Sequence, residues 1–326
     1  MIDIYILVAL ALVFNFLNGF HDSSNIVATI IFSRAMPPQV ALYMTAVAEF
    51  IGPFLFGVAV AKTIGEDIVS PDTINMLVLI TALSVSILWN LFTWYFGIPS
   101  SSSHALIGGI IGAVMAGTGF ASIQFSGLLK VIIALFISPI LGLVVGFLFT
   151  RLIFFLTKNS SMKINKFFKN SQIVTGVGLA LSHGANDAQK TMGIIALGLV
   201  VSGTLTEFSV PFWVIVVSSL AISIGTAVGG WRLIRTLGSG FYKIKPVHGF
   251  ATQVSSAVII LGAALVGGPV STTQVVSSAI LGVGSAQRIN MVRWGVAGNI
   301  LATWFLTIPL NIGLSWLLYH VLTTIF

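Results

Sequence analysis

The stretch His183-Gly184-Ala185-Asn186-Asp187-Ala188-Gln189-Lys190 lies between two long apolar runs. It places a carboxylate, two amides and an amine where the flanking residues have the composition of a membrane interior. Because a charged group at bilayer depth is costly, it usually faces a cavity and has a function. A related polar stretch, Gly19-Phe20-His21-Asp22-Ser23-Ser24-Asn25, lies near the start of the chain. We therefore predict two copies of one unit, folded so that the two polar stretches meet.

The composition excludes a soluble protein. Of the 326 residues, 56% are hydrophobic and only 7% are charged, whereas soluble domains carry about 25% charged residues. This deficit predicts an all-α polytopic protein in the lipid bilayer. The net charge of +7 lies in short loops, as the positive-inside rule describes, so we expect no nucleic-acid partner. Cysteine is absent, which excludes disulfides and thiolate metal sites. Met1-Ile2-Asp3 lacks the basic region of a signal peptide, so the first apolar run should be a retained helix.

About ten apolar runs approach the length of about 20 residues that spans a bilayer. They lie at 4–33, 39–60, 74–97, 104–117, 128–156, 171–200, 211–230, 249–267, 274–286 and 292–320. The runs 4–33 and 171–200 contain the polar stretches, and counting each as two broken pieces gives about twelve segments. The runs 104–117 and 274–286 are too short to cross, so we expect half-length helices or parts of re-entrant hairpins.

Matches that recur in the same order along the chain indicate an internal repeat. When the second half of the chain is laid over the first, Asp22 aligns with Asp187. Farther on, and with nearly the same shift, Gly97–His104 aligns with Gly267–Gln274. Any one match could arise by chance, but ordered matches with similar shifts predict a duplicated unit.

The charges of the loops predict the topology. The loop 61–73 carries a net charge of −2 and its counterpart, 231–247, carries +4, so the two should lie on opposite sides of the membrane. Such an inverted repeat is typical of secondary transporters. We predict repeats at 1–156 and 171–326, joined by a basic cytoplasmic linker at 157–170. Five crossings in each repeat would place both termini outside the cytoplasm.

The polar motifs are expected to form an anion site. Gly19 and Gly184 weaken helix continuity, so each acidic stretch should interrupt its helix and cap a restarted one. Pro99 and Pro269 should end the preceding runs, and the hydroxyl residues after them should open new helices. These hydroxyl residues are Ser101, Ser102, Ser103, Ser271, Thr272 and Thr273. Four helix N-termini would then converge, and their free N–H groups and hydroxyls favour a phosphate-like anion.

Two carboxylates conflict with a bound anion unless cations compensate them. Asp22 and Asp187 would repel an oxyanion in a low-dielectric pocket. Carboxylate, amide, hydroxyl and carbonyl oxygens are available to hold sodium, and the neutral donors among them outnumber plausible proton carriers, which favours sodium over protons. Lys190 would add a fixed positive charge or extend to water instead. We therefore predict a cation-coupled anion symporter without a cofactor, in which sodium is a co-transported ligand.

The paired motifs resemble those of the PiT inorganic phosphate transporters over nearly the whole chain. Gly184-Ala185-Asn186-Asp187 matches the signature of that family, and residues 19–25 look like a degenerate first copy. The resemblance implies uptake of inorganic phosphate across the cell membrane, driven by a sodium or proton gradient. Together with the argument above, the expected phosphate-binding residues are Asn25, Ser101, Ser102, Ser103, Asn186, Lys190, Ser271, Thr272 and Thr273. The expected cation-binding residues are Asp22, Asn25, Thr29, Glu49, Asn186 and Asp187, of which Asp22 and Asp187 would bind sodium.

The chain departs from the signature of that family at a few positions. His21 stands where the signature has asparagine, and Lys190 and Gln274 replace the asparagine and histidine of many members. In the repeat register, Lys190 is the counterpart of Asn25. These departures resemble the bacterial branch of the family.

Other interpretations compete with this one. Glu49 and the hydroxyl residues are also suited to joining helices by hydrogen bonds. His21 and His104 fit either a proton relay or simple packing, and His183 and His248 are expected at interfaces or in loops. Competing functions are a proton-coupled or metal-phosphate symporter, a passive anion channel, and transport of sulfate. We expect no enzyme, because no nucleophile–base arrangement or His-Glu-x-x-His motif is present. The oligomeric state is left open, with a homodimer as one option.

Overall fold

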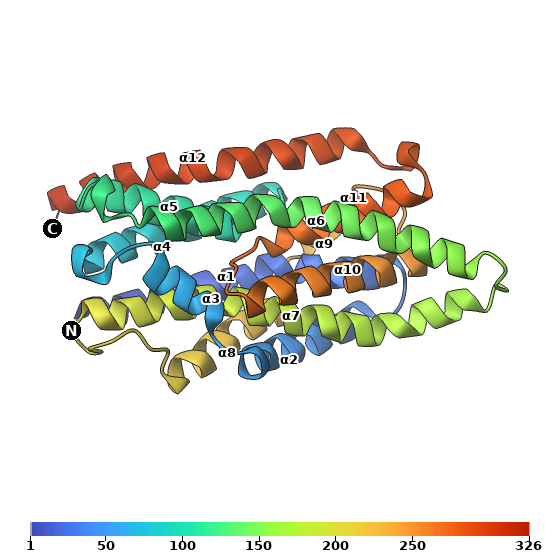
Figure 1. Cartoon of the computed structure of the whole chain (residues 1–326), viewed down its shortest axis with the longest axis horizontal. Coiled ribbons are helices and arrows are strands. Elements are labelled where there is room, and N and C mark those ends of the chain that lie inside the picture. Colours follow the sequence, from blue (N-terminus) through green and yellow to red (C-terminus); the bar gives the residue numbers. More distant parts are fainter. Residues whose placement is uncertain (1, 326) are drawn as a thin grey trace.

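The computed structural model describes residues 2–325, and this range contains twelve α-helices (Figure 1). In chain order they are α1 (Ile2–Phe32), α2 (Pro38–Phe56), α3 (Ala59–Lys62), α4 (Met76–Phe96), α5 (Ser102–Gly117), α6 (Phe125–Thr157), α7 (Ile164–Val201), α8 (Phe212–Val228), α9 (Trp231–Ser239), α10 (Pro246–Leu265), α11 (Thr272–Gln287) and α12 (Trp294–Ile325). Short 3-10 and π turns join some of them, and the described residues form no β-strand. The all-α prediction is therefore confirmed.

The bundle has the surface of a membrane protein. Six helices are long and apolar enough to cross a bilayer, namely α1, α2, α4, α6, α10 and α12, and the bent pair α8–α9 makes a seventh. Large apolar side chains such as Leu88 and Phe305 are exposed, whereas Asp22, Asp187 and Lys190 are buried. This distribution inverts that of a soluble protein, and a lipid surrounding suits it because the helices satisfy their own backbone groups. The prediction of a multi-pass membrane protein is confirmed.

The prediction that the acidic stretches interrupt their helices is wrong. Helix α1 runs unbroken through Asp22 for 31 residues, and α7 runs unbroken through Asp187 for 38 residues. The breaks lie elsewhere, between α2 and α3 and between α8 and α9, where the two helices of the second pair bend by 69°. Gly57 and Gly229 end α2 and α8 with φ of 79° and 76°, a conformation that glycine adopts without steric cost. Broken helices therefore occur at corresponding places in the two halves, away from the acids.

Gly19 and Gly184 serve packing rather than helix breakage. A Cβ at Gly184 would lie 2.2 Å from the carbonyl oxygen of Glu49 on α2. In the other half, a Cβ at Gly19 would lie 2.1 Å from the carbonyl oxygen of Ile222 on α8. Both distances are far below van der Waals contact, so only glycine permits these two backbones to touch. Each acid-bearing helix is thus fixed against the second helix of the opposite half.

We expect Gly184→Ala to destabilise the protein by about 1–3 kcal/mol, because the added methyl group must push α2 away from α7. Gly178→Ala on the same helix is the matched control, since a Cβ there meets no atom within 4 Å. The control should be neutral or gain up to about 1 kcal/mol from better helix propensity. Thermal unfolding of both purified variants in detergent measures the difference. Equal unfolding temperatures would contradict the packing role of Gly184.

The two halves of the chain interlock through equivalent contacts. Helix α1 packs against α8 and α2 packs against α7, while α5 packs against α12 and α11 packs against α6. In each case a helix of the first half meets a helix of the second half, and the pairs correspond by their order in the chain. Neither half therefore buries its core without the other. This exchange brings the polar stretches of both halves to one place.

The half-length helices belong to two hairpins that approach from opposite ends of the bundle. Helices α4 and α5 occupy the end that holds both termini, and α10 and α11 occupy the other end (Figure 1). Their tips meet in the middle, where Ser103 Oγ donates a hydrogen bond to the Val270 carbonyl at 3.1 Å. Each half thus contains one short helix, α5 or α11, paired with a longer one, α4 or α10, as expected for a hairpin.

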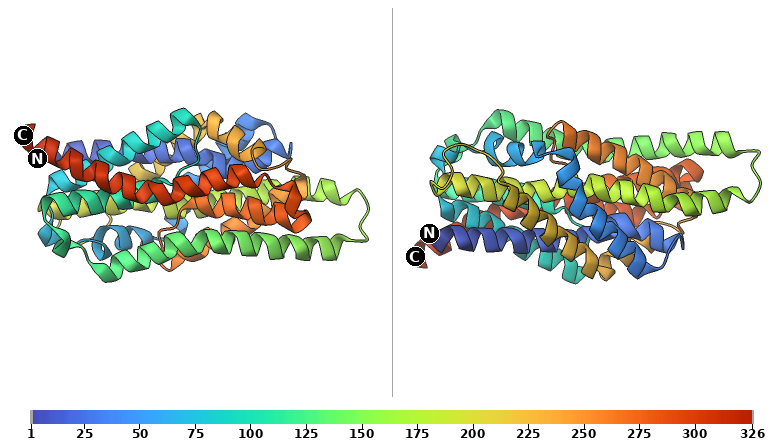
Figure 2. Two further views of the ribbon diagram at one scale, coloured as in Figure 1. Left: turned by 90° about the horizontal axis from the view of Figure 1, so that it is seen from above. Right: turned by 90° about the horizontal axis from the view of Figure 1, so that it is seen from below.

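The start of α1 and the end of α12 lie at the same end of the bundle, and the loop between α6 and α7 lies at the opposite end (Figure 2). That loop is shorter than the sequence suggested. Helix α7 already begins at Ile164, so only part of the basic segment 157–170 is an irregular connection. The segment carries Lys158, Lys163, Lys166 and Lys169, which concentrates positive charge at one end of the molecule.

Candidate functional site

Asp22 and Asp187 come together in the centre of the bundle. Thr272 at the start of α11 donates toward both, with Oγ1 2.7 Å from Asp187 Oδ2 and 3.3 Å from Asp22 Oδ2. Both aspartates are buried, at 2% and 0% exposure. The predicted meeting of the two acidic stretches is therefore present, and a hydroxyl at a helix N-terminus joins them.

His183 is the residue that the sequence interpretation missed. Its Nδ1 lies 2.6 Å from Glu49 Oε1, and its Nε2 lies 2.9 Å from Asp187 Oδ2 and 3.6 Å from Asp22 Oδ2. The ring is completely buried, which contradicts the expected place at an interface or in a loop. The spacing contained the signal, because residues four apart on a helix share a face and His183 precedes Asp187 by four. The imidazole thus bridges three carboxylates.

Lys190 is paired inside the protein and does not extend to water. Its ammonium group contacts Asp187 Oδ1, lies 2.6 Å from Ser103 Oγ, and lies 2.8 Å from the Val270 carbonyl. The side chain is only 1% exposed. Three oxygens from α7, α5 and the tip of the second hairpin therefore surround the ammonium group.

Asn25 holds the corresponding place beside Asp22. Its Nδ2 lies 2.9 Å from Asp22 Oδ1 and 3.2 Å from Thr273 Oγ1, and the Thr273 hydroxyl donates to Asp22 Oδ1 at 2.7 Å. The Asn25 Oδ1 atom is buried and has no hydrogen-bond partner among the described residues. Asn186 is similar, since its Nδ2 donates to the Gly268 carbonyl at 3.1 Å while its Oδ1 has no such partner. Two buried amide oxygens are thus left free to accept.

The hydroxyl motifs open the two helices predicted for them, but two rather than four helix N-termini converge. Ser101 is the N-cap of α5 and accepts from the His104 N–H at 3.1 Å, and Ser271 is the N-cap of α11 and accepts from the Gln274 N–H at 3.4 Å. Because α1 and α7 are continuous, the two N-termini expected there do not exist. Of the four expected helix N-termini, those of α5 and α11 are present in the described residues and direct their first N–H groups to the centre.

Some predicted residues lie at the edge of this site or outside it. Ser102 Oγ donates to Asn18 Oδ1 at 2.6 Å, one turn before Asp22 on α1. Thr29 lies two turns beyond Asp22 and accepts from Gln253 Nε2 at 3.0 Å, rather than contacting the carboxylates. Glu49, by contrast, joins the cluster through His183 and through a hydrogen bond from Thr226. The structure thus brings Glu49 to the centre and leaves Thr29 apart.

The charges at this site favour a hard cation. Asp22, His183 and Asp187 each place a ligand atom within 4.8 Å of the others. Three carboxylates, counting Glu49, face two basic groups, Lys190 and His183. With all three carboxylates ionised, the set carries one net negative charge when His183 is protonated and two when it is neutral. Such a buried excess of negative charge is stabilised by a further cation or by a proton.

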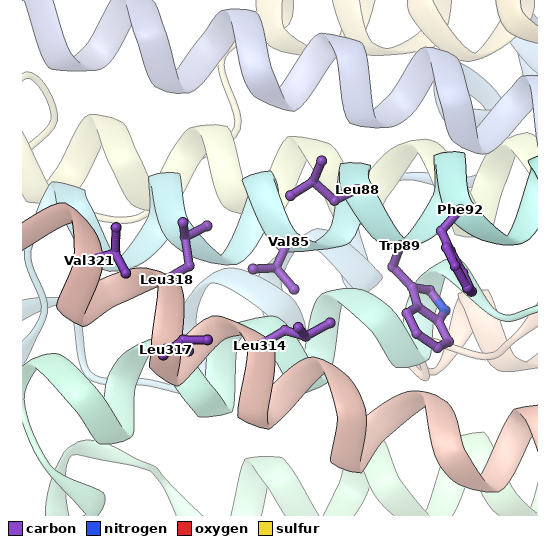
Figure 3. Close-up of a pocket in the computed structure, with 8 residues that line it drawn as sticks. All are labelled: Val85, Leu88, Trp89, Phe92, Leu314, Leu317, Leu318 and Val321. Atoms are coloured by element: carbon purple, nitrogen blue, oxygen red, sulfur yellow. The ribbon is translucent and has the colours of Figure 1, made fainter.

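The large groove on the outside of the bundle is a different kind of feature. It lies between α4 and α12, has a volume of about 590 Å³, and is lined by Val85, Leu88, Trp89, Phe92, Leu314, Leu317, Leu318 and Val321 (Figure 3). These side chains are apolar apart from the indole N–H of Trp89. The groove offers no charge to an anion, so the candidate site is the polar cluster in the centre.

Comparison with known proteins agrees with this geometry. The profile of the phosphate transporter family matches residues 18–315. A protein of Bacillus subtilis named "Probable low-affinity inorganic phosphate transporter" is 44% identical over 325 residues, covering 98% of this chain and 97% of that protein. A Rhizobium meliloti protein of the same name is 45% identical, covering 96% and 94%. A solved structure described as "The sodium-dependent phosphate transporter" has a TM-score of 0.90 and 25% identity, covering 100% of both chains.

Proposed function

The chain belongs to the phosphate transporter family, and on that premise we propose that it imports inorganic phosphate by symport with sodium. Its relatives are transporters rather than enzymes, and so is this protein. The observation that carries the proposal is the convergence of Asp22, Asp187 and Thr272 at the tip of α11. Anion donors and cation ligands meet there at one buried point.

The chemistry of the site explains why the two ligands would travel together. The N–H groups at the tips of α5 and α11 attract an oxyanion, while the carboxylates beside them repel it. Sodium bound to Asp22 would neutralise that repulsion and make the anion site competent. Each ligand therefore raises the affinity for the other, and this reciprocal coupling is what symport requires.

The hairpins α4–α5 and α10–α11 are the elements that we expect to move during transport. We propose that residues 1–156 and 171–326 are inverted repeats, and that these hairpins, one from each repeat, open alternately around their touching tips. The basic end of the bundle, with the α6–α7 loop, would face the cytoplasm, and both termini would face the outside of the cell membrane. A passive anion channel would instead need a polar path that stays open, whereas the central residues here are buried.

Proton coupling is the second candidate. It is favoured by the His183 ring, which lies between Glu49 and the two aspartates and offers a group that can bind and release a proton. Sodium remains the first proposal because the groups around Asp22, namely the hydroxyls of Thr272 and Thr273 and the amide of Asn25, are neutral. The solved relative is described as sodium-dependent, which also supports sodium.

Uptake of radioactive phosphate into proteoliposomes tests the proposal. We expect saturable uptake with an inward sodium gradient at equal pH, and little uptake when choline replaces sodium and a pH gradient is applied instead. An excess of sulfate should compete poorly. Uptake driven by the pH gradient alone would replace sodium by protons in the mechanism. Uptake that persists after both gradients are collapsed would favour the channel.

A further inference from the structure

Three positions of the site correspond between the two halves, and one of these three pairs differs in charge. The register of the acidic stretches pairs Asp22 with Asp187 and Asn25 with Lys190. The register of the hydroxyl motifs pairs Ser103 with Thr273. The acid and the hydroxyl are thus retained in both halves, whereas the third member is an amide in one half and an amine in the other.

The contacts follow the same symmetry. Lys190 Nζ contacts Asp187 Oδ1 and lies 2.6 Å from Ser103 Oγ. Asn25 Nδ2 lies 2.9 Å from Asp22 Oδ1 and 3.2 Å from Thr273 Oγ1. The nitrogen of each side chain therefore contacts the carboxylate of its own half and the hydroxyl at the hairpin tip of the other half. Two corresponding oxygen cages result, and the one around Lys190 also includes the Val270 carbonyl.

The ammonium group of Lys190 fills the second cage as a cation would. It is surrounded by a carboxylate oxygen, a hydroxyl oxygen and the Val270 carbonyl oxygen, and it is 1% exposed. Carboxylate, hydroxyl and carbonyl oxygens are also the ligands of hard cations in proteins. The positive charge at this position is therefore part of the chain and need not be taken from solution.

The first cage lacks such a charge. Asn25 is neutral, and its buried Oδ1 has no partner among the described residues. Turning the amide over, so that its oxygen and nitrogen exchange places, would direct this oxygen toward Asp22 and Thr273, and such flips are a matter of hydrogen-bond assignment. The cage would then present a carboxylate, a hydroxyl and an amide oxygen, and a cation is what these acceptors need.

We propose that Lys190 is a tethered counterion that permanently occupies one of two symmetry-related cation sites, so that only the site of Asp22, Asn25 and Thr273 takes up a free sodium ion. The inference rests on the proposed sodium symport and adds to it the number of sodium ions that move with each phosphate. This chain would move one sodium ion fewer per phosphate than the same chain with an amide at position 190.

The substitution Lys190→Asn tests this, because it places at position 190 the same residue as its counterpart in the first half, Asn25. Wild type and variant are compared in proteoliposomes clamped at zero membrane potential, with a tenfold inward sodium gradient, and steady phosphate accumulation is measured. One additional coupled sodium ion should raise the accumulation ratio by about tenfold and steepen the dependence of uptake on sodium concentration. Lys158→Asn in the exposed α6–α7 loop is the matched control and should leave the ratio unchanged.

The outcomes separate this inference from the proposed function. An unchanged accumulation ratio in Lys190→Asn, with a wild type that is driven by sodium, overturns the tethered counterion and leaves the symport intact. A wild type whose uptake ignores sodium overturns both.

A binding measurement decides the question if Lys190→Asn does not fold. Sodium chloride, compared with choline chloride, should raise the unfolding temperature of the wild type in detergent, because a ligand that binds only the folded state stabilises it. The double variant Asp187→Asn/Lys190→Met should keep this sodium-dependent shift, and Asp22→Asn should lose it. Loss of the shift in the double variant would overturn the proposal, since the free ion would then depend on the second cage.

Discussion

Replacing Asp22 by asparagine should abolish sodium-driven phosphate uptake while leaving the protein folded. The substitution keeps the shape of the side chain, so the hydroxyls of Thr272 and Thr273 and the amide of Asn25 retain a neighbour of the same size. It removes the only charge in the first oxygen cage. Sodium then loses its anionic ligand, and phosphate loses the cation that makes its site competent.

Coupling free energies of about 1–3 kcal/mol correspond to factors of about 5 to 150. We therefore expect uptake to fall to or below the lower end of what such factors leave, about 1% of the wild-type rate. Radioactive phosphate uptake in proteoliposomes gives the rate, and size-exclusion elution in detergent reports folding. Asp72→Asn, at an exposed position in the loop before α4, is the matched control and should transport like the wild type. Wild-type rates in Asp22→Asn would show that this acid takes no part in coupling.

The position of Asp22 illustrates what a single sequence reveals. Its partnership with Asp187 follows from the repeat alone, because a charge in each copy of a membrane unit needs a common polar interior. The helix starts at Ser101 and Ser271 also follow from local chemistry, since a proline followed by hydroxyl residues provides both a stop and an N-cap. These features depend on neighbours in the chain.

Gly184 illustrates what the sequence does not reveal. A glycine beside polar residues suggests a helix break, yet this glycine lies inside α7 because the Glu49 backbone crosses it. That crossing partner belongs to the other half of the chain, so no local pattern identifies it. Reading Gly19 and Gly184 as helix breaks also led to the prediction of two helix N-termini, in α1 and α7, that the structure does not contain. It also concealed His183, whose ring is buried against Glu49 of α2 and Asp22 of α1.

Removing the ammonium group of Lys190 should have the second large effect. Lys190→Met leaves the buried Asp187 without its ammonium partner, and breaking a buried ion pair in this way costs about 3–5 kcal/mol. We expect a correspondingly lower unfolding temperature in choline buffer and no phosphate uptake, because methionine provides neither a charge nor an oxygen to the second cage. The control is Lys158→Met, whose side chain is exposed in the α6–α7 loop.

The double variant Asp187→Asn/Lys190→Met separates stability from transport. Both charges of the pair are removed together, so the desolvation penalty disappears and most of the lost stability should return. Transport should not return, because the positive charge beside the tips of α5 and α11 is still missing and the oxyanion has no fixed counterion on that side. Unfolding temperature in detergent and uptake in proteoliposomes are measured on the same preparations. Recovery of both would make Lys190 a partner needed only to neutralise Asp187, and recovery of neither would mean that the pair is not an isolated electrostatic unit.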